Sequence, residues 1–225
     1  MQSLKDFLLK WGSEYEFLSH AVTIFNPTAS VTWSRQQKKL FVRLFYHARG
    51  HFDRFLWIMA SMAPSTTYRS VILQNITDEL GGLREGDLSH EQLLFRFAKV
   101  LDPQIEKEVR TEENYLPFLK AFNKGHVDAL LKADWDYKWA MFSAYEHLDN
   151  VDYENLLRLV EGMGVTGNNL EFFNVHRKGN HFEKTFLLLE EVWNRDSRTV
   201  RQAFDFIGRH QLSMWRSMSR AILRV

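Results

Sequence analysis

One stretch organises this chain of 225 residues, and it reads Asn169-Leu-Glu-Phe-Phe-Asn-Val-His-Arg-Lys-Gly-Asn-His-Phe-Glu-Lys-Thr-Phe-Leu-Leu-Leu-Glu190. Its apolar residues recur at roughly helical spacing, which predicts one long helix over residues 169–190. His176, Asn180 and Glu183 fall at i, i+4 and i+7, on one face of that helix. Polar groups on a helix that also buries apolar neighbours need partners, and either a metal ion or a hydrogen-bond network supplies them.

The composition is that of a folded domain with ample material for a core. Hydrophobic residues make up 45% of the chain, including 18 Phe, 7 Trp and 7 Tyr, which suits a single domain over residues 1–225. The aromatic clusters Trp135–Trp139 and Trp193–Trp215 are interpreted as core packing. Lys plus Arg (29) nearly balances Asp plus Glu (28), so no net field favours nucleic acid or an anionic membrane as a partner.

Cysteine is missing from the sequence, so any metal ligands must be His and carboxylate side chains. Lys5, Asp6 and Lys10 interrupt the N-terminus, and no apolar run approaches the roughly 18–20 residues that cross a bilayer. We therefore expect a cytoplasmic protein. The sequence also has no Gly-x-Ser-x-Gly elbow, no phosphate loop and no dinucleotide fingerprint, which argues against the enzyme classes that use them.

Helix breakers are rare and separate long periodic segments, which predicts an all-α fold. Only four prolines occur, and a glycine pair stands at Gly81-Gly82. Ser89 and Gln92 have the spacing of a capping box, so His90 should lie in the first turn of a helix. Besides 169–190, helices are predicted over residues 4–22, 34–62, 66–80, 89–101, 112–124, 126–132, 134–148, 153–163 (capped by Asp152) and 197–223, with a short segment after Asp102-Pro103.

Four side chains are candidates for a polar site, and each has an ordinary alternative. Glu79 ends a helix among apolar residues, where it could be a solvated or capping carboxylate, and His90 could be a first-turn surface residue. Glu146 follows an apolar run that is typical of a buried segment, while His176 could be a hydrogen-bonded core histidine. Together, two carboxylates and two histidines from several helices match the composition of an iron or manganese site in a carboxylate bundle.

His47 and His51 form a second group at i, i+4, with Asp53 close by. Such a histidine pair can bind one metal ion. The surrounding arginines at positions 43, 49 and 54 favour a solvated or ion-paired face instead.

Three segments carry a family resemblance. They are Asn75-Ile-Thr-Asp-Glu-Leu-Gly-Gly82 followed by Ser89-His90; Ser143-Ala-Tyr-Glu-His-Leu-Asp-Asn-Val-Asp-Tyr-Glu-Asn-Leu-Leu157; and Leu170-Glu-Phe-Phe-Asn-Val-His176. In their order and content the chain resembles the heme-oxygenase-like superfamily, in particular the CADD-like branch of non-heme diiron oxidases and oxygenases, relatives of TenA and PqqC. The resemblance implies an all-α, heme-oxygenase-like (TenA/PqqC-like) bundle of about seven to nine helices.

The resemblance also implies a ligand set for two iron ions. The positions that match the family's ligands are Glu79, His90, Glu146 and His176. The chain departs from the family at the end of the motif, where Asn180 stands at an Asp position and Glu183 at a His position. Glu183 keeps an anionic oxygen ligand, whereas Asn180 removes a charge and should weaken at least one metal site.

The function implied by the resemblance is a non-heme (di)iron oxidase or oxygenase that activates dioxygen on a small organic substrate in the bundle core. Manganese or a single ion are alternatives for the metal, and a homodimer is compatible with the fold. Two other functions stay open. One is a metal-free TenA- or PqqC-like enzyme or ligand-binding protein acting on a small heterocycle, and the other is a helical interaction protein with a relic site.

Overall fold

The computed structural model describes residues 2–50, 52–82, 87–109, 111, 115–178 and 181–225. Within these ranges the chain forms α-helices and short 3-10 helices (η) and contains no strand, which confirms the all-α prediction. The elements are α1 (Leu4–Ser19), η1 (Thr23–Phe25), η2 (Ala29–Thr32), α2 (Arg35–Arg49), α3 (Phe52–Met62), α4 (Thr66–Glu79), α5 (His90–Leu101), α6 (Ile105–Val109), α7 (Pro117–Lys132), α8 (Trp135–Gly162), η3 (Gly167–Leu170), α9 (Glu171–Lys178) and α10 (His181–Leu223).

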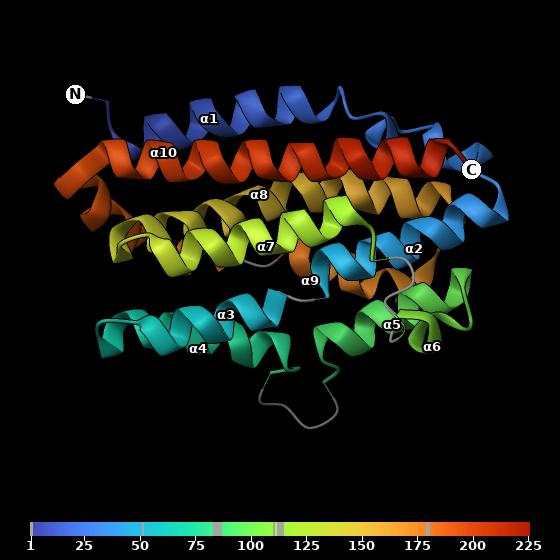
Figure 1. Cartoon of the computed structure of the whole chain (residues 1–225), viewed down its shortest axis with the longest axis horizontal. Helices are drawn as coiled ribbons and strands as arrows, with labels where there is room; N and C mark the ends of the chain where they lie inside the picture. The colour runs from blue at the N-terminus through green and yellow to red at the C-terminus, as the bar shows by residue number, and fades with distance from the viewer. Residues whose placement is uncertain (1, 51, 83–86, 110, 112–114, 179–180) are drawn as a thin grey trace.

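Helix α8 is the central element of the bundle. It packs against α10, α9 and α1, and Figure 1 shows α1 and α10 running side by side above it, with α3, α4, α5 and α6 on the other side of the molecule. Buried residues occur all around α8 rather than along one stripe, as expected for a helix enclosed by neighbours. Trp139 and Trp215 are fully buried, which confirms that these aromatic residues serve core packing.

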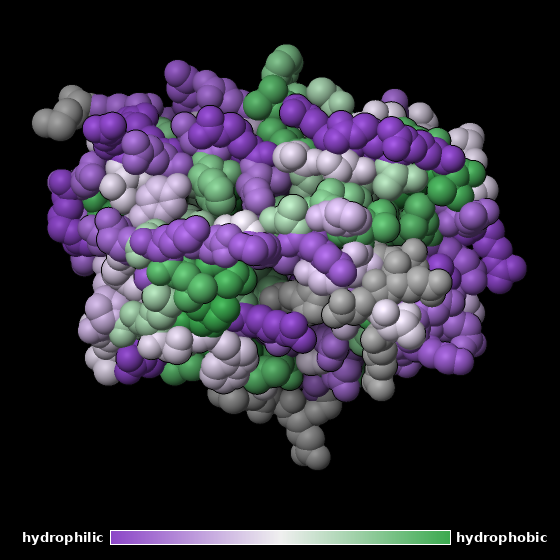
Figure 2. All heavy atoms as spheres, viewed as in Figure 1, coloured by the Kyte–Doolittle hydropathy of each residue, from purple (hydrophilic) through white to green (hydrophobic). Residues whose placement is uncertain are grey.

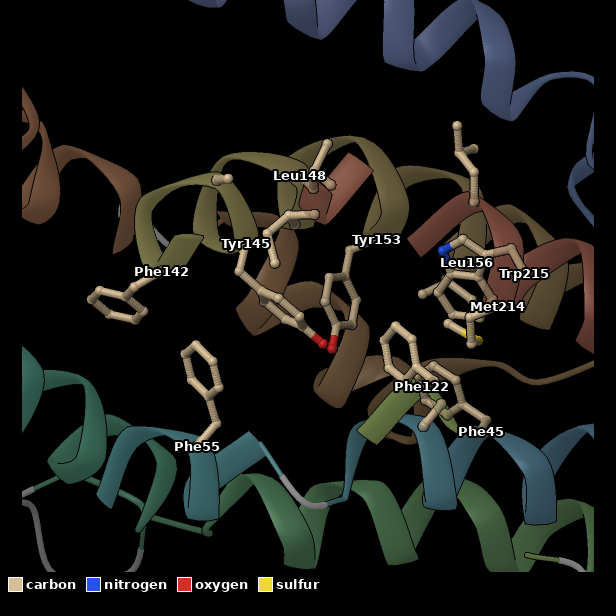
Figure 3. Close-up of a cluster of buried hydrophobic side chains, with 14 of the residues drawn as sticks. Phe45, Phe55, Phe122, Phe142, Tyr145, Leu148, Tyr153, Leu156, Met214 and Trp215 are labelled. Atoms are coloured by element: carbon tan, nitrogen blue, oxygen red, sulfur yellow. The ribbon is translucent and has the colours of Figure 1, made fainter. Parts of the chain in front are cut away.

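Aromatic side chains of α8 fill the core and reach toward the junction of α2 and α3. Figure 3 shows Tyr145 and Tyr153 pointing from α8 to this junction, while Phe55 of α3 points back toward Phe142 and Tyr145. Their ring centroids lie 6.4 Å (Phe55 to Phe142) and 6.1 Å (Phe55 to Tyr145) apart. The junction is therefore covered by aromatic surface from inside the bundle.

Helix α8 also corrects a prediction, because residues 134–148 and 153–163 belong to one unbroken helix. Asp152 does not cap a helix but lies inside α8 with 0% of its surface exposed. Its carboxylate accepts hydrogen bonds from Tyr15 at 2.9 Å, Gln211 at 2.9 Å and Trp215 at 2.8 Å. These donors come from α1 and α10, which are far away in sequence. Tertiary contacts therefore supply the hydrogen bonds that the backbone of a helix start would have supplied locally.

The predicted helix 34–62 is divided. Helix α2 ends at Arg49 and α3 begins at Phe52, and in Figure 1 the two follow one another along the same edge of the bundle. Gly50 caps α2 by donating its backbone N–H to the Tyr46 carbonyl at 2.6 Å. Glycine is a poor helix former, and here its position matters because the junction opens a cavity behind it. The opposite difference occurs in α7, which joins the two predicted helices 112–124 and 126–132 from Pro117 onward.

The stretch 169–190 is likewise not one helix. Residues 167–170 form η3, α9 ends at Lys178, and α10 begins at His181, so His176 and Glu183 belong to different helices. Asn180 lies outside the described residues. Farther along α10, Asp196 has non-helical backbone angles (φ −152°, ψ 89°) and accepts from the Arg198 N–H at 3.0 Å, which agrees with the helix predicted to start at residue 197.

The surface in the view of Figure 2 is mostly hydrophilic, with hydrophobic side chains in separate patches. In the described part of the chain, no helix combines the length and the apolar character needed to span a bilayer.

Candidate metal centre

The site is built where the end of α4 meets the start of α5. Helix α4 closes with a Schellman arrangement, in which the Gly82 N–H donates to the Thr77 carbonyl at 2.8 Å and the Gly81 N–H to the Asp78 carbonyl at 3.1 Å. Both glycines have positive φ, 102° and 72°, a conformation that other residues adopt only with strain. The sequence thus ends α4 directly after Glu79.

The conformation of Gly81 also lets the next helix come close. A Cβ atom at Gly81 would lie 3.0 Å from backbone atoms of Asp87, Leu88 and Ser89, so only glycine allows this approach. Ser89 then starts α5 with the predicted capping box, in which its hydroxyl accepts from the Gln92 N–H at 3.1 Å. His90 is therefore the first residue of α5 and faces the end of α4.

Glu79 and His90 meet at this joint. Their Oε1 and Nδ1 atoms lie 3.0 Å apart, and His90 is only 8% exposed. No group among the described residues makes a hydrogen bond of acceptable geometry to His90 Nδ1, including Glu79. A close approach without hydrogen-bond geometry is expected when the lone pairs of both atoms point toward a common third atom.

His176 joins the pair from α9. Its Nδ1 lies 2.7 Å from the Phe172 carbonyl oxygen, which can only accept, so Nδ1 carries the proton. The other ring nitrogen, Nε2, lies 4.0 Å from Glu79 Oε1. Tyr153 stacks on the ring with centroids 4.3 Å apart and fixes its plane. Histidine ligands of metal ions are usually held in this way, with one nitrogen bonded to the protein and the other directed to the metal.

The ligand atoms of Glu79, His90 and His176 all lie within 4.8 Å of one another. Around a first-row divalent ion with bonds of about 2.1 Å, neighbouring ligand atoms are about 3 Å apart and opposite ones about 4 Å apart. The distances of 3.0 and 4.0 Å from Glu79 fit this range. The structure thus brings together three of the six side chains that the sequence nominated.

Glu146 borders a second, smaller cavity next to the cluster. This cavity is bordered by Glu79, Glu146 and His176, with Asp149 one helical turn beyond Glu146 on α8. Glu146 is buried, and its Oε1 has no hydrogen-bond partner in the part of the chain that the structure describes. It therefore lies beside the three-residue cluster rather than within it.

The other nominated residues differ in their placement. Glu183 is exposed in the first turn of α10 and does not border either cavity as the structure describes them. Asn180 and His51 lie outside the described residues. His47 is not on the solvated face that the surrounding arginines suggested, because it is 2% exposed and stacks on Tyr115 with ring centroids 4.7 Å apart.

Arg49 is the main residue that sequence reasoning missed. It was assigned to a solvated face, yet it is 6% exposed and lies 3.2 Å from Asp149 and 3.3 Å from Asp152. It also donates to the Tyr145 hydroxyl at 2.6 Å. The available signal was the spacing of three carboxylates at 146, 149 and 152 on one side of a mostly apolar helix, which requires a buried cation opposite.

Negative charge nevertheless dominates around the cluster. Burial raises the pKa of Glu146 well above its usual range, and the nearby charges of Asp149 and Glu79 raise it further. Burial likewise raises the pKa of Asp149 to about 7, although Arg49 acts in the opposite direction. A bound dication would stabilise the ionised forms of these carboxylates and reverse this tendency.

A cavity of about 130 Å³ opens beside the cluster, bordered by Arg49, Asp149, Tyr153 and the three candidate ligands. Within the described residues, the buried Nδ1 of His90 without a hydrogen-bond partner, the tautomer of His176 and the excess of carboxylates all fit a divalent metal ion. Nitrogen and oxygen donors of this kind suit iron, manganese and zinc.

Comparison with known proteins identifies the family to which the chain belongs. The sequence profile of a family described as iron-containing redox enzymes matches residues 39–179, which include Glu79, His90, Glu146 and His176. No curated protein shows a significant match to the chain.

Solved structures share the fold. A domain of unknown function with a heme oxygenase-like fold from Shewanella denitrificans OS217 superposes with a TM-score of 0.76 at 13% identity, over 98% of this chain and 94% of that one. A CADD-like protein of unknown function from Nostoc punctiforme PCC 73102 gives a TM-score of 0.71 at 14% identity, over 95% and 97% of the two chains. A second crystal structure of that protein gives 0.69 at 15% identity, over 96% of each chain. At these identities the likeness establishes the heme-oxygenase-like fold and confirms the predicted architecture.

Proposed function

This chain belongs to the family of iron-containing redox enzymes, and from that premise we propose that it binds iron through Glu79, His90 and His176 and oxidises a small organic molecule with dioxygen. One observation carries the proposal. The ligand atoms of these residues come from three different helices and converge within 4.8 Å.

The metal would supply the redox chemistry, since iron held by His and carboxylate ligands with open positions reacts with dioxygen. The protein's own residues would prepare the site for it. His176 keeps its proton on Nδ1 and presents Nε2. Tyr153 and Phe172 pack on the ring of His176 and shield it from water, with ring centroids 4.3 and 4.5 Å away.

A dinuclear centre is the fuller form of the proposal. Glu79 borders both cavities, so its carboxylate is placed to serve an ion on either side, and Glu146 would contribute the main anionic ligand to the second ion. Asp149 would keep its ion pair with Arg49 and remain beside that ion as a proton acceptor. Asn180 and Glu183 stand at the positions of the family's last two ligands, with other residue types there, and their role as ligands stays a prediction.

Anaerobic loading with ferrous iron tests the proposal. The protein should bind iron at one or two equivalents, and mixing the loaded protein with oxygenated buffer should oxidise the iron at a rate well above that of free ferrous ion. Glu79→Gln and His176→Gln should each lower iron affinity by at least tenfold, whereas Glu161→Gln, which changes an exposed carboxylate on α8 that borders neither cavity, should not. Trace iron binding that is equal in all four proteins would refute iron ligation and leave the metal-free alternative.

A further inference from the structure

A third and larger cavity lies on the other side of the α2–α3 junction from the metal centre. Its volume is about 400 Å³, against about 130 Å³ for the cavity beside Glu79 and His90. It is enclosed by α3, by α7 and by Tyr145 of α8. Cavities of about 300 Å³ and more are large enough for an organic ligand, whereas the smaller one suits an ion and a few small molecules.

The cavity walls are aromatic. Phe52 and Phe55 of α3 face Tyr145 of α8, and Tyr115 precedes α7. The rings of Phe52 and Tyr145 stack with centroids 4.8 Å apart at an angle of 17°, and those of Phe55 and Tyr145 lie 6.1 Å apart at 30°. Aromatic walls in parallel orientation favour a flat, apolar ligand body.

Hydrogen bonds hold these walls in place without involving a ligand. The Tyr145 hydroxyl accepts from Arg49 at 2.6 Å. Asn123 donates to the Tyr115 hydroxyl and to the His47 carbonyl, both at 2.8 Å. A pocket whose walls are already ordered binds its ligand without the entropic cost of ordering them.

Among the residues that the structure describes, the charge at the cavity rim has one sign. Arg54, Lys120 and Lys124 border the cavity, and no carboxylate does so among the residues that the structure describes. Lys124 is paired with Asp128, but neither Arg54 nor Lys120 has a carboxylate within ion-pairing distance in the described ranges. Lys120 instead lies over the ring of Tyr115, 5.2 Å from its centroid.

The interior is neutral. His126 is the main polar group in it, and burial together with the nearby charge of His210 lowers its pKa well below the usual range. His126 therefore adds no charge at neutral pH. The cavity combines a cationic rim with an uncharged aromatic interior, which is complementary to a molecule with an anionic group at one end and a flat ring at the other.

We propose that this cavity binds an aromatic carboxylate, with its carboxylate at Lys120 and Arg54 and its ring against the sides of Phe55 and Tyr145 that line the cavity. Phe52 borders both this cavity and the one beside the metal ligands, so it is the partition between them. If the proposed function holds, the far end of the ring is the part that reaches the partition. This last step rests on the proposed function, whereas binding itself does not.

Calorimetric titration of the full-length protein tests the binding. The probes are 2-naphthoate and 2-acetylnaphthalene, which share a ring system but differ in charge. 2-Naphthoate should bind at one equivalent and at least tenfold more tightly than the neutral ketone. The double variant Arg54→Met/Lys120→Met should weaken naphthoate binding about tenfold and leave the ketone unchanged. Lys107→Met, which removes an exposed cation on α6, is the matched control and should change neither.

A steric variant tests the location. Val127 borders the cavity from α7, and Val127→Trp should abolish naphthoate binding by filling it. Equal affinity for the two probes, or unchanged naphthoate binding in both variants, would overturn the inference. Iron binding measured on the same samples keeps the two proposals distinct. Naphthoate binding without iron binding would refute the proposed function alone, and iron binding without naphthoate binding would refute this inference alone.

Discussion

Replacing Gly81 by alanine tests whether the close approach of α4 and α5 builds the metal centre. Gly81 has φ 102°, and alanine at such an angle costs about 1–2 kcal/mol of stability. The new Cβ would also lie 3.0 Å from three backbone atoms of residues 87–89, where ordinary contacts are about 3.5–4.0 Å. The start of α5 must therefore move by roughly 0.5 Å or more.

A movement of that size exceeds the tolerance of a metal site. Ligand distances in such sites are held to within about 0.2 Å. Because His90 is the first residue of α5 and Glu79 the last of α4, the displacement separates these two ligands directly. We expect Gly81→Ala to lower iron affinity about 10- to 100-fold, the usual effect of disturbing the support of a metal ligand.

The chain offers a matched control in Gly164. Its φ is 90°, close to that of Gly81, but a Cβ there would meet no atom within 4 Å. Gly164→Ala should therefore lose a similar 1–2 kcal/mol or so of unfolding free energy and keep its iron affinity. Urea unfolding measures the first quantity and competition with a ferrous chelator the second. If both variants bind iron equally, the crowding at Gly81 does not position His90.

Three further predictions concern the buried charges. Glu146→Gln should stabilise the metal-free protein at neutral pH and weaken iron binding. Because the folded-state pKa of Glu146 is raised, the wild type loses stability as the pH rises above the pKa of this group in the unfolded state. Urea unfolding at pH 5 and pH 8 should show that the variant does not have this loss. Asp149, with a folded-state pKa of about 7, should give the metal-free wild type a further decline in stability from about pH 4 to pH 7, and Asp149→Asn should flatten that slope; an unchanged slope would contradict the burial of this carboxylate. Arg49→Met should destabilise the protein by about 3–5 kcal/mol because it leaves Asp149 and Asp152 without their cation, and adding Asp152→Asn should recover part of the loss in the same unfolding assay.

Local signals in the sequence predicted the end of α4 and the start of α5, where the candidate metal centre lies. The glycine pair after Glu79 and the capping box at Ser89 are short-range features, and they suffice to end one helix and start the next with His90 in its first turn. His176 joins Glu79 and His90 only because α9 packs on α5, which is a contact between elements far apart in sequence. The family resemblance nominated all three residues, and the structure brings these three together.

The burial of Asp152 and Arg49 could not be predicted from the sequence, because it depends on contacts between residues far apart in the chain. Asp152 is of a residue type that often caps helices. Inside α8, however, its carboxylate accepts hydrogen bonds from Tyr15, Gln211 and Trp215. Arg49 stands among arginines that are typical of a solvated face, and only the fold shows that it opposes the carboxylates of α8. Neither assignment could be made from periodicity, since burial of a polar group is decided by its partners. Dimerisation and a cytoplasmic location stay predictions.

Anomalous diffraction at the iron edge, on crystals loaded with ferrous iron, tests the central claim most directly. A peak is expected within about 2.3 Å of Glu79 Oε1, His90 Nδ1 and His176 Nε2, with any second peak beside Glu146. Data collected across the manganese edge would identify the metal. A peak at any other place on the protein, with these three side chains bonded to each other instead, would contradict it.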